Sequence, residues 1–575
     1  MAEWEKVHEK WTTFHNLDPV LKEELDHLAD NQHALEDAFY KELTFGTGGL
    51  RGVLGAGINR MNIYTVRKAV NGLAQYLREN RVNVYDRGVA ISYDSRYMSQ
   101  EFAMETAKVL GAYGIRSYVF ETLHPTPALS FAVRYLGAAA GVMITASHNP
   151  PEYNGFKVYN EDGGQIVPAE ADEIIAFIQQ TENELTVPFL ERSELEAKEL
   201  LNWIGDEIDN AYLEQLLQIS KLDNEELQQQ KDMPIVFTPL HGTAFELVTQ
   251  GLRQLNFTNV DVVKEQAAPD PEFSTVDSPN PEEHQAFTMA IHEGKNSNAD
   301  VLIGTDPDAD RLGVAAKDDS GEYKVLTGNQ LGSLLLDYIL SHSQDAILAN
   351  GRMIKTIVTS ELGKKIAAAY DVETIDTLTG FKYIGEKIRQ FDATGESFVF
   401  GYEESYGYLI SSFSRDKDAV QAAVLACEMA YYWKKRGKTL HEALDGLFEK
   451  YGYYLEGMSA LTLKGKEGSE KIAAIMKNIR SQPLTEIDGL KVLQVEDYLA
   501  GERKLLENGS VEEINLPKEN VVKFKLEKDC WVCLRPSGTE PKIKCYFGVC
   551  TTSKEESAST LERLKREMES VMDQV

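Results

Sequence analysis

The stretch GVMITASHNPPEYNGFKVY, residues 141–159, turns abruptly from an apolar run into a polar loop that presents Ser147. The run predicts a buried strand that ends near Thr145. Helical patterns such as SQEFAMETAKVLGAYG (99–114) alternate with runs of this kind. The same strand-to-loop transition recurs at VAISYDSR (89–96), IVFTPLHGTA (235–244), VLIGTDPDADR (301–311), AILANGRMIKT (346–356) and FVFGYEESYG (398–407). This alternation predicts α/β domains with mostly parallel sheets, in which ligands collect at the carboxyl ends of strands.

The chain of 575 residues is longer than one hydrophobic core normally serves. At about 150 residues per domain, it is expected to form about four domains. The charged segment 189–219 is predicted to be a helical connector between the first two. The last segment differs, because strands around VVKFKL and KIKCYFGV precede a helix, which indicates a smaller α+β unit. We predict domains over residues 1–207, 208–323, 324–451 and 452–575.

The net charge disfavours several classes of partner. The formal net charge is −32, from 91 acidic and 59 basic residues, which disfavours nucleic acid and anionic membranes. The sequence shows no secretory signal and no apolar stretch of about 20 residues. Five cysteines are too few to cross-link a chain of this length, which favours a reducing compartment. We therefore expect a cytoplasmic protein with no nucleic-acid or membrane partner.

Four cysteines, Cys530, Cys533, Cys545 and Cys550, lie close together in the sequence and raise the question of zinc. The first two have the CxxC spacing of zinc sites. The residues around them are those of a strand, and the second pair is spaced differently. Since a free cysteine packs as a small hydrophobic residue, buried strand cysteines are the favoured interpretation.

The loop GTDPDADR (304–311) follows an apolar strand and alternates Asp306, Asp308 and Asp310. Three carboxylates this close repel one another unless a cation lies among them, and hard oxygen ligands suit Mg²⁺ or Ca²⁺. A calcium loop of the helix–loop–helix type is excluded, because Arg311 and Lys317 stand where that loop needs glycine and glutamate. A solvated acidic turn is the alternative, and the strand exit favours a metal site.

The loop RPSGTEPKIK (535–544) contains Arg535, Ser537, Gly538, Thr539 and Lys542. A guanidinium group, two hydroxyls and a tight backbone turn match the oxygens of a phosphate dianion. No Walker pattern is present, so a nucleotide P-loop is not indicated. The alternative is a plain Pro-Gly turn between two strands.

Two further loops could contact a ligand. GYEESYG (401–407) places Glu403, Glu404 and Ser405 after a strand, where they could accept hydrogen bonds from sugar hydroxyls, although glutamate pairs usually face solvent. FGTGGLRG (45–52) carries Arg51 in a glycine-rich turn that lacks the context of a dinucleotide site, so a flexible loop is the alternative.

Ser147 itself could cap a turn, attack a substrate or carry a covalent group. The GxSxG context of a serine hydrolase is missing, and the adjacent His148 is expected to be badly placed as a base. A phosphorylated serine close to three aspartates and a divalent cation makes physical sense, because the cation offsets the charge of the phosphate.

Taken together, the motifs resemble those of the α-D-phosphohexomutases, within their phosphoglucomutase branch, which also includes phosphopentomutase-like enzymes. The four main motifs occur in the order of that family, and supporting matches extend the resemblance from about residue 45 to about residue 545. The main motifs are TASHNP (145–150), TDPDADR (305–311), GYEESYG (401–407) and RPSGTEPK (535–542). The supporting matches are FGTGGLRG, YDSR (93–96), HPTPALS (124–130), TPLHGT (238–243), TLTGFKYIGEKI (377–388) and SRDKDA (414–419).

The resemblance implies four domains around a central cleft. Three of them would be related α/β domains with mixed, largely parallel sheets, and the fourth a smaller α+β C-terminal domain. In chain order, they would carry the phosphoserine loop, the metal loop, the sugar loop and the phosphate-binding loop.

The resemblance also implies roles for individual residues. Ser147 would carry the phosphoryl group and, through a phosphoserine oxygen, help Asp306, Asp308 and Asp310 to hold Mg²⁺. Arg51, Lys157 and Arg311 would surround the transferred group, with His148 beside it and no assigned role. Glu403, Ser405, Thr379 and Gly380 would bind the sugar, and Arg535, Ser537, Gly538 and Thr539 the non-reacting phosphate.

One position departs from part of the family. The phosphomannomutase/phosphoglucomutase type carries a histidine two residues after the sugar-loop serine, where this chain has Gly407. The phosphoglucomutase type uses a lysine in the segment matched by SRDKDA. The resemblance therefore implies that Lys417 transfers the proton, with Lys157 as the second candidate.

The activity implied is the interconversion of α-D-glucose 1-phosphate and glucose 6-phosphate through a glucose 1,6-bisphosphate intermediate. Phosphopentomutase and phosphomannomutase activities are the alternatives within the family. A catalytically inactive sugar-phosphate-binding protein and a serine hydrolase are alternatives of other classes. The expected partner is a small phosphorylated sugar, and no oligomeric state is predicted.

Overall fold

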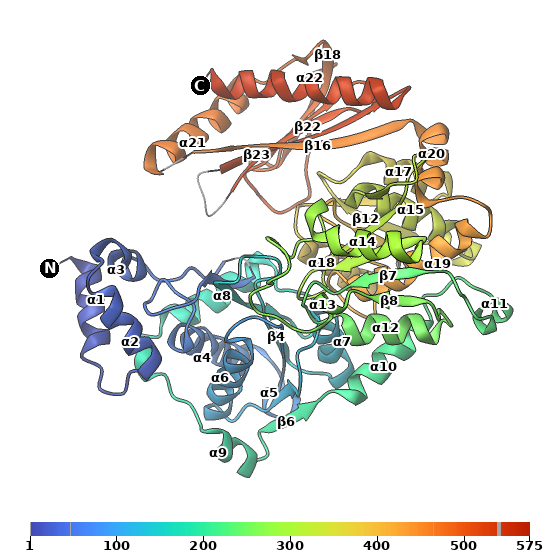
Figure 1. Cartoon of the computed structure of the whole chain (residues 1–575). Helices are drawn as coiled ribbons and strands as arrows, with labels where there is room; N and C mark the ends of the chain where they lie inside the picture. The colour runs from blue at the N-terminus through green and yellow to red at the C-terminus, as the bar shows by residue number, and fades with distance from the viewer. Residues whose placement is uncertain (1, 47, 464, 538–541, 575) are drawn as a thin grey trace.

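A computed structural model describes residues 2–46, 48–463, 465–537 and 542–574. Four sheets follow one another along the chain, each with its own helices (Figure 1). The first three combine parallel and antiparallel strands, and the fourth is antiparallel. We call them, with their helices, the first, second, third and C-terminal units. This architecture confirms the predicted fold class of three α/β units and a C-terminal unit of different build.

The first unit has the strand order β1-β5-β4-β2-β3-β6. Neighbouring strands from β4 to β6 are parallel, whereas β5 and β1 are antiparallel to their neighbours. The strands are β1 (Gly49–Val53), β2 (Val89–Tyr93), β3 (Ser117–Phe120), β4 (Ala140–Ile144), β5 (Tyr153–Tyr159) and β6 (Leu201–Ile204). The helices are α4 (Ile63–Asn80), α5 (Val84–Arg87), α6 (Ser99–Ala112), α7 (Thr126–Leu136), α8 (Pro168–Gln179) and α9 (Arg192–Ala197), with a 3₁₀ turn at Glu184–Thr186.

The connector predicted at 189–219 is not a single helical segment. Its middle part forms β6, which pairs in parallel with β3 at the edge of the first sheet. Leu201 is buried and Trp203 packs against the core of the first unit, so these apolar side chains outweigh the helical pattern on either side. Only the residues from Asp206 onward lead into the next unit.

Three N-terminal helices pack against the first unit: α1 (Glu3–Thr12), α2 (Pro19–Leu28) and α3 (Gln32–Phe39). Trp11 is fully buried, and its indole N–H donates to Glu184 Oε1 at 2.7 Å. Glu24 Oε2 accepts a hydrogen bond from the backbone N–H of Ala56 at 3.0 Å. The helices therefore support the loop between β1 and α4.

The second unit has the strand order β11-β10-β9-β7-β8, and the third has β13-β12-β14-β15. The strands of the second are β7 (Ile235–Thr238), β8 (Val260–Val262), β9 (Val301–Thr305), β10 (Leu312–Lys317) and β11 (Tyr323–Val325). Its helices are α10 (Asp206–Leu217), α11 (Asn224–Gln228), α12 (Phe245–Gln254), α13 (Lys264–Ala267) and α14 (Thr288–Ser297), with a 3₁₀ turn at His284–Phe287. The strands of the third are β12 (Gly351–Thr356), β13 (Glu373–Thr377), β14 (Ser397–Tyr402) and β15 (Tyr408–Leu409). Its helices are α15 (Gly328–Ser341), α16 (Asp345–Leu348), α17 (Glu361–Ala369), α18 (Phe381–Thr394), α19 (Ala419–Lys434) and α20 (Leu440–Tyr451).

The C-terminal unit is an eight-stranded sheet with two long helices, α21 (Gly465–Ser481) and α22 (Lys554–Asp573), and it lies above the other units in Figure 1. The main path runs β16-β23-β22-β21-β18-β19-β20, and β17 pairs with β18. The strands are β16 (Tyr453–Thr462), β17 (Glu486–Ile487), β18 (Leu490–Asp497), β19 (Glu502–Leu505), β20 (Val511–Glu513), β21 (Val522–Leu526), β22 (Trp531–Pro536) and β23 (Lys542–Thr551).

The clustered cysteines belong to this sheet, and all are free thiols. Cys533 packs in the apolar cluster that faces the third unit, whereas Cys545 packs in the core beneath α21 and α22. Because the two thiols point to opposite faces, they cannot share a metal ion. Cys533 and Cys545 are therefore buried strand cysteines, whereas Cys530 lies just before β22 and Cys550 of β23 is half-buried. Among the described residues, none of the four belongs to a cluster of metal ligands.

The C-terminal unit is held on the third unit by apolar packing and a buried lysine. Trp531 and Tyr498 pack against Ile357 of the third unit. Lys523, only 2% exposed, donates from Nζ to the carbonyl of Ile357 at 2.6 Å and lies 3.5 Å from Glu361. Its ammonium also lies 4.6 Å from the ring of Trp531. The lysine thus satisfies a carbonyl and a carboxylate at the boundary between the units.

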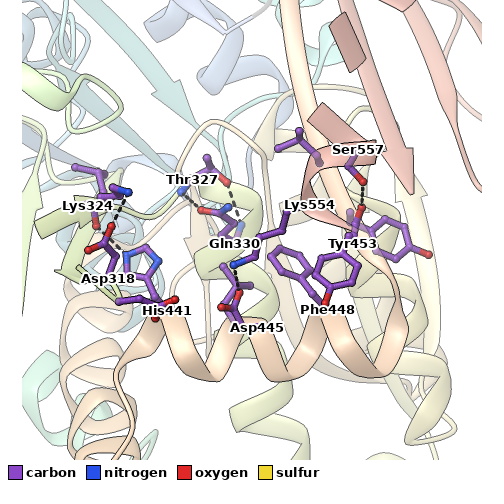
Figure 2. A pocket seen from close by; sticks show the side chains of 15 residues that line it. Asp318, Lys324, Thr327, Gln330, His441, Asp445, Phe448, Tyr453, Lys554 and Ser557 are labelled. Atoms are coloured by element: carbon purple, nitrogen blue, oxygen red, sulfur yellow. Dashed lines mark hydrogen bonds and ion pairs between the residues drawn. The ribbon is translucent and has the colours of Figure 1, made fainter. Parts of the chain in front are cut away.

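A cavity of ≈ 480 Å³ lies where the second, third and C-terminal units meet (Figure 2). Lys554 of α22 pairs with Asp445 of α20 at 2.6 Å across this junction. Ser557 donates to the carbonyl of Tyr453 at 2.5 Å. None of the side chains predicted to form the functional site lines this cavity.

Substituting Lys523→Met is expected to weaken the junction between the third and C-terminal units. The carbonyl of Ile357 loses its donor, so the free energy of unfolding should fall by about 1–3 kcal/mol. The measurement is the midpoint of thermal unfolding, compared with the exposed control Lys518→Met. Equal midpoints for the two variants would contradict the assignment.

Candidate active site

The predicted functional loops follow the carboxyl ends of strands from three different sheets. Ser147 lies in the turn after β4, Asp306 begins the loop after β9, and Glu403 follows β14. Ser147 Oγ donates to Asp306 Oδ2 at 2.5 Å, although 159 positions separate the two residues. The serine loop and the acidic loop therefore meet directly.

The serine turn has an unusual backbone. Ser147 has a φ of 51°, in the left-handed region that non-glycine residues rarely adopt. Its N–H donates to Thr145 Oγ1 at 2.8 Å, and its side chain is nearly buried. His148 Nδ1 lies 3.1 Å from Ser147 Oγ, so the expectation that this neighbour is badly placed was wrong. Burial, together with Arg311, lowers the pKa of His148 to about 3, which makes its imidazole a weak base.

Asp306, Asp308 and Asp310 form a compact cluster of carboxylates. They are at most 3% exposed, and one oxygen from each lies within 4.8 Å of the others. Asp306 Oδ1 accepts the N–H groups of Asp310 at 3.0 Å and Arg311 at 2.9 Å. Oδ1 of Asp308 and of Asp310 are buried and have no hydrogen-bond partner among the described residues. These two oxygens are therefore available as ligands.

The charges of the cluster are incompletely balanced by protein groups. Burial, with the charges of Asp310 and Asp308, raises the pKa of Asp306 well above its ordinary value. Burial would also raise the pKa of Asp308, but the ammonium of Lys157 outweighs it and lowers that pKa. Buried carboxylates with free oxygens and one carboxyl that resists ionisation fit a divalent cation with hard oxygen ligands. Burial thus excludes the alternative of a solvated acidic turn.

Two lysines approach the cluster from other elements. Lys157 of β5 places Nζ 2.8 Å from Asp308 Oδ2, and Lys417, just before α19, places Nζ 3.0 Å from Asp310 Oδ2. Burial would lower the pKa of Lys417, but Asp310 and Asp416 outweigh it, so the pKa is raised. The amine is therefore held in its protonated form.

Gly407 makes room for the lysine. A Cβ atom at this position would lie 2.3 Å from Cδ and 2.8 Å from Cγ of Lys417. A side chain at position 407 would therefore require Lys417 to shift. The glycine at position 407, where part of the family has a histidine, thus leaves the space that the side chain of Lys417 occupies.

The predicted sugar loop is arranged around a buried glutamate. Glu403 Oε1 accepts the N–H of Gly380 at 2.8 Å, and burial raises the pKa of Glu403 to about 7. The buried hydroxyl of Thr379 has no hydrogen-bond partner among the described residues, and Ser405 is half-buried. Glu404 instead accepts hydrogen bonds within the third unit, from Thr356 and Thr359 at 3.2 Å each. Of the two glutamates, Glu403 is therefore the better placed for a ligand.

Of the two predicted arginines, Arg51 contacts the serine turn and Arg311 belongs to the acidic loop. Arg51 is exposed and donates to Asn149 Oδ1, two residues after Ser147, at 3.2 Å. Arg311 pairs with Glu282, and its Nε lies 3.9 Å from Asp310.

The predicted phosphate loop is described only in part, because Gly538 and Thr539 lie outside the described residues. Arg535 donates from Nε to Glu519 at 2.9 Å, and the N–H of Ser537 donates to the carbonyl of Lys542 at 2.7 Å. Burial, with the charges of Lys542 and Arg535, lowers the pKa of the nearby Lys544. Several cations thus gather at this loop.

Comparisons with known proteins place nearly the whole chain in one family. Four family descriptions match in order: Phosphoglucomutase/phosphomannomutase alpha/beta/alpha domain I over residues 42–185, domain II over 210–321, domain III over 327–451 and the C-terminal domain over 470–565. The chain belongs to the phosphoglucomutase/phosphomannomutase family. Helices α1 to α3 precede the first matched region.

Relatives within the phosphoglucomutase/phosphomannomutase family support this. A phosphoglucomutase of Staphylococcus aureus (strain bovine RF122 / ET3-1) is 42% identical over 91% of this chain and 93% of its own length. A phosphoglucomutase of Staphylococcus haemolyticus is 40% identical over 89% of this chain and 91% of its own length. The open form of Paramecium parafusin, a phosphoglucomutase, superposes with a TM-score of 0.69 at 18% identity, covering 93% of this chain and 95% of that one. A phosphoglucomutase/phosphomannomutase family protein of Burkholderia thailandensis superposes with a TM-score of 0.66 at 17% identity, covering 92% of this chain and 97% of that one. The last two show the shared fold.

Some residues at the site were not singled out from the sequence. Thr126, in the HPTPALS motif, donates from Oγ1 to Asp308 Oδ2 at 2.9 Å, and its N–H donates to the carbonyl of Asp308 at 2.9 Å. Arg96, in the YDSR motif, contacts the serine turn. Both motifs follow strands in the sequence, and this position could have indicated that Thr126 and Arg96 lie at the site.

Removing one carboxylate of the cluster should weaken binding of a divalent cation. For Asp308→Asn, we expect Mn²⁺ affinity to fall about tenfold to a hundredfold, because one charged ligand oxygen is lost. Isothermal titration of the full chain measures this, with the exposed acidic residue variant Asp319→Asn as the control. Unchanged affinity in Asp308→Asn would refute the site.

Adding a single methyl group at Gly407 should displace Lys417. For Gly407→Ala, kcat in the mutase assay below is expected to fall about tenfold to a hundredfold, because the lysine must leave Asp310. The matched control is Gly446→Ala in α20, where a Cβ meets nothing within 4 Å and the helix should become more stable by about 1 kcal/mol. Full activity in Gly407→Ala would show that the position of Lys417 is unimportant.

Proposed function

We propose that the chain is a phosphoglucomutase that interconverts α-D-glucose 1-phosphate and glucose 6-phosphate. The observation that carries the proposal is the 2.5 Å contact of Ser147 Oγ with Asp306 Oδ2, inside a buried acidic cluster flanked by two lysines. The curated phosphoglucomutases at 40–42% identity support the same activity. As an intramolecular phosphotransferase, the enzyme belongs to the isomerases.

In the proposed reaction, phosphorylated Ser147 donates its phosphoryl group to the free hydroxyl of a glucose monophosphate. The bond between Ser147 Oγ and phosphorus breaks, and a bond from the sugar oxygen to phosphorus forms, which gives glucose 1,6-bisphosphate. The sugar hydroxyl loses a proton and Ser147 Oγ gains one. After the bisphosphate turns round, the other phosphoryl group returns to Ser147.

The proton transfer is assigned to Lys417, with Lys157 as the second candidate. The raised pKa of Lys417 keeps a proton available for the leaving serine oxygen. The space that Gly407 leaves for this lysine favours the phosphoglucomutase type over the type with a histidine at that position. His148 remains a neighbour of the reacting hydroxyl without an assigned role.

The cation is proposed to be Mg²⁺, held by Asp306, Asp308 and Asp310 together with an oxygen of phosphorylated Ser147. When bound, it supplies positive charge that offsets the charge of the phosphoryl group. Arg51 and Arg311 are proposed to add positive charge around the same group, because both lie next to the loops that carry it.

The remaining predicted residues are proposed to bind the rest of the substrate. Glu403, Ser405, Thr379 and Gly380 would contact the sugar hydroxyls. The buried hydroxyl of Thr379, which has no hydrogen-bond partner among the described residues, supports this. Arg535, Ser537, Gly538 and Thr539 would bind the non-reacting phosphate. Because this phosphate is on either end of the sugar in alternate half-reactions, the loop needs donors that accept both orientations.

The proposed setting is the cytoplasm, with a small sugar phosphate as partner and no nucleic acid or membrane. The net charge of −32 supports this, and within the described residues no helix is long and apolar enough to cross a membrane. We also propose domain boundaries near residues 207, 323 and 451.

A comparison of three sugars tests the activity. Purified chain with Mg²⁺ and the matching bisphosphate is assayed on glucose 1-phosphate, mannose 1-phosphate and ribose 1-phosphate. We expect the highest kcat/KM for glucose 1-phosphate, and a loss of at least about 10³-fold in Ser147→Ala. A higher value for ribose 1-phosphate would make the chain a phosphopentomutase, and for mannose 1-phosphate a phosphomannomutase. Turnover of none of them would refute the proposal.

A further inference from the structure

We propose that Arg96 is the positioning residue of the serine turn, and that Phe273 of the second unit holds it in place. The inference rests on the proposed function, because it concerns the serine that carries the phosphoryl group. Arg96 and Asp94 belong to the YDSR motif, which the predicted site leaves without a role. Both side chains are fully buried.

Arg96 binds the serine turn through four main-chain carbonyls. Nη2 donates to the carbonyl of Ser147 at 2.5 Å and also to that of Asn149. Nη1 donates to the carbonyls of Pro150 at 2.8 Å and Tyr153 at 3.0 Å. The turn therefore closes around one planar guanidinium group, which is the only side chain type with enough donors in this geometry.

The arginine is itself fixed from two other directions. Asp94 Oδ1 accepts the backbone N–H of Arg96 at 3.0 Å, and Asp94 Oδ2 lies 3.5 Å from Nε. The ring of Phe273 lies 4.9 Å from the guanidinium carbon. Phe273 is 1% exposed and comes from the second unit. The guanidinium group thus lies close to both a carboxylate and an aromatic ring.

The position of the Arg96 guanidinium group matters because it holds the backbone of the serine turn. Ser147 has a φ of 51°, which is unfavourable for a serine unless its surroundings enforce it. This conformation directs Oγ toward Asp306. Since Phe273 and Asp306 both belong to the second unit, Arg96 aligns the serine turn with the unit that carries the acidic cluster. Among the described residues, no hydrogen bond joins Arg96 to Asp306 or to the proposed substrate loops, so it acts through the turn.

The test substitutes lysine for this arginine in the full chain and measures mutase kinetics. Arg96→Lys keeps the charge for Asp94 but cannot reach four carbonyls. We expect kcat to fall about tenfold to a hundredfold, because the reacting hydroxyl is displaced, while KM changes less than about threefold. Phosphorylation of Ser147 by glucose 1,6-bisphosphate, followed by intact mass, should slow in parallel.

The matched control is Arg87→Lys. Arg87 also donates to two main-chain carbonyls of the first unit, those of Gly137 at 2.8 Å and Ala138 at 3.0 Å, but far from the serine turn. Its kinetics should remain those of the unchanged chain. An equal loss of kcat in Arg87→Lys, or unchanged kcat in a folded Arg96→Lys, would overturn the proposal.

If Arg96→Lys does not fold, Phe273→Leu decides, because it keeps the arginine and removes only the aromatic face. A fall in kcat of about two- to tenfold at unchanged KM would support the proposal, and unchanged kcat would overturn it. Failure of the proposed function is distinguishable, since the unchanged chain would then lack mutase turnover altogether.

Discussion

The repulsion among three buried carboxylates is the constraint on which the site depends. Asp306, Asp308 and Asp310 lie on one short loop, and burial makes their charges costly to maintain. Three neighbouring segments supply groups that stabilise this charge: the hydroxyl of Ser147 after β4, the ammonium of Lys157 in β5 and the ammonium of Lys417 before α19. The first three units thus meet at one electrostatic centre, and their carboxyl edges must face it.

Much of the fold and of the site could be predicted from the sequence, because the reactive side chains directly follow the predicted strands. The acidic loop, the serine turn and the glutamate loop each follow an apolar run, so both the fold class and the candidate residues could be named. The clustered cysteines were assigned to strands for the same reason, since the residues between them have a strand pattern. The short strand β6 was missed, because four residues inside a charged, helix-favouring segment give little signal.

Contacts between distant segments could not be predicted in this way. Nothing local indicates that Gly407 is small because Lys417 passes over it, or that Thr126 binds Asp308. The orientation of His148 depends on the left-handed turn at Ser147, which sequence patterns do not determine. Such pairings depend on how three sheets are placed relative to one another, and a single sequence contains that information only indirectly.

The order of strands in the C-terminal sheet has a consequence for how the chain is made. β16 pairs with β23 along its whole length, from Tyr453 with Thr551 to Thr462 with Lys542, and it has no second neighbour among the described strands of the sheet. At about 5–20 residues per second, a ribosome needs on the order of ten seconds to reach the partner strand. During that interval, a ten-residue strand is exposed with both edges open, a state prone to pairing with other chains. We therefore expect newly made chains to be most prone to such pairing at this late point of synthesis, after the three α/β units have emerged.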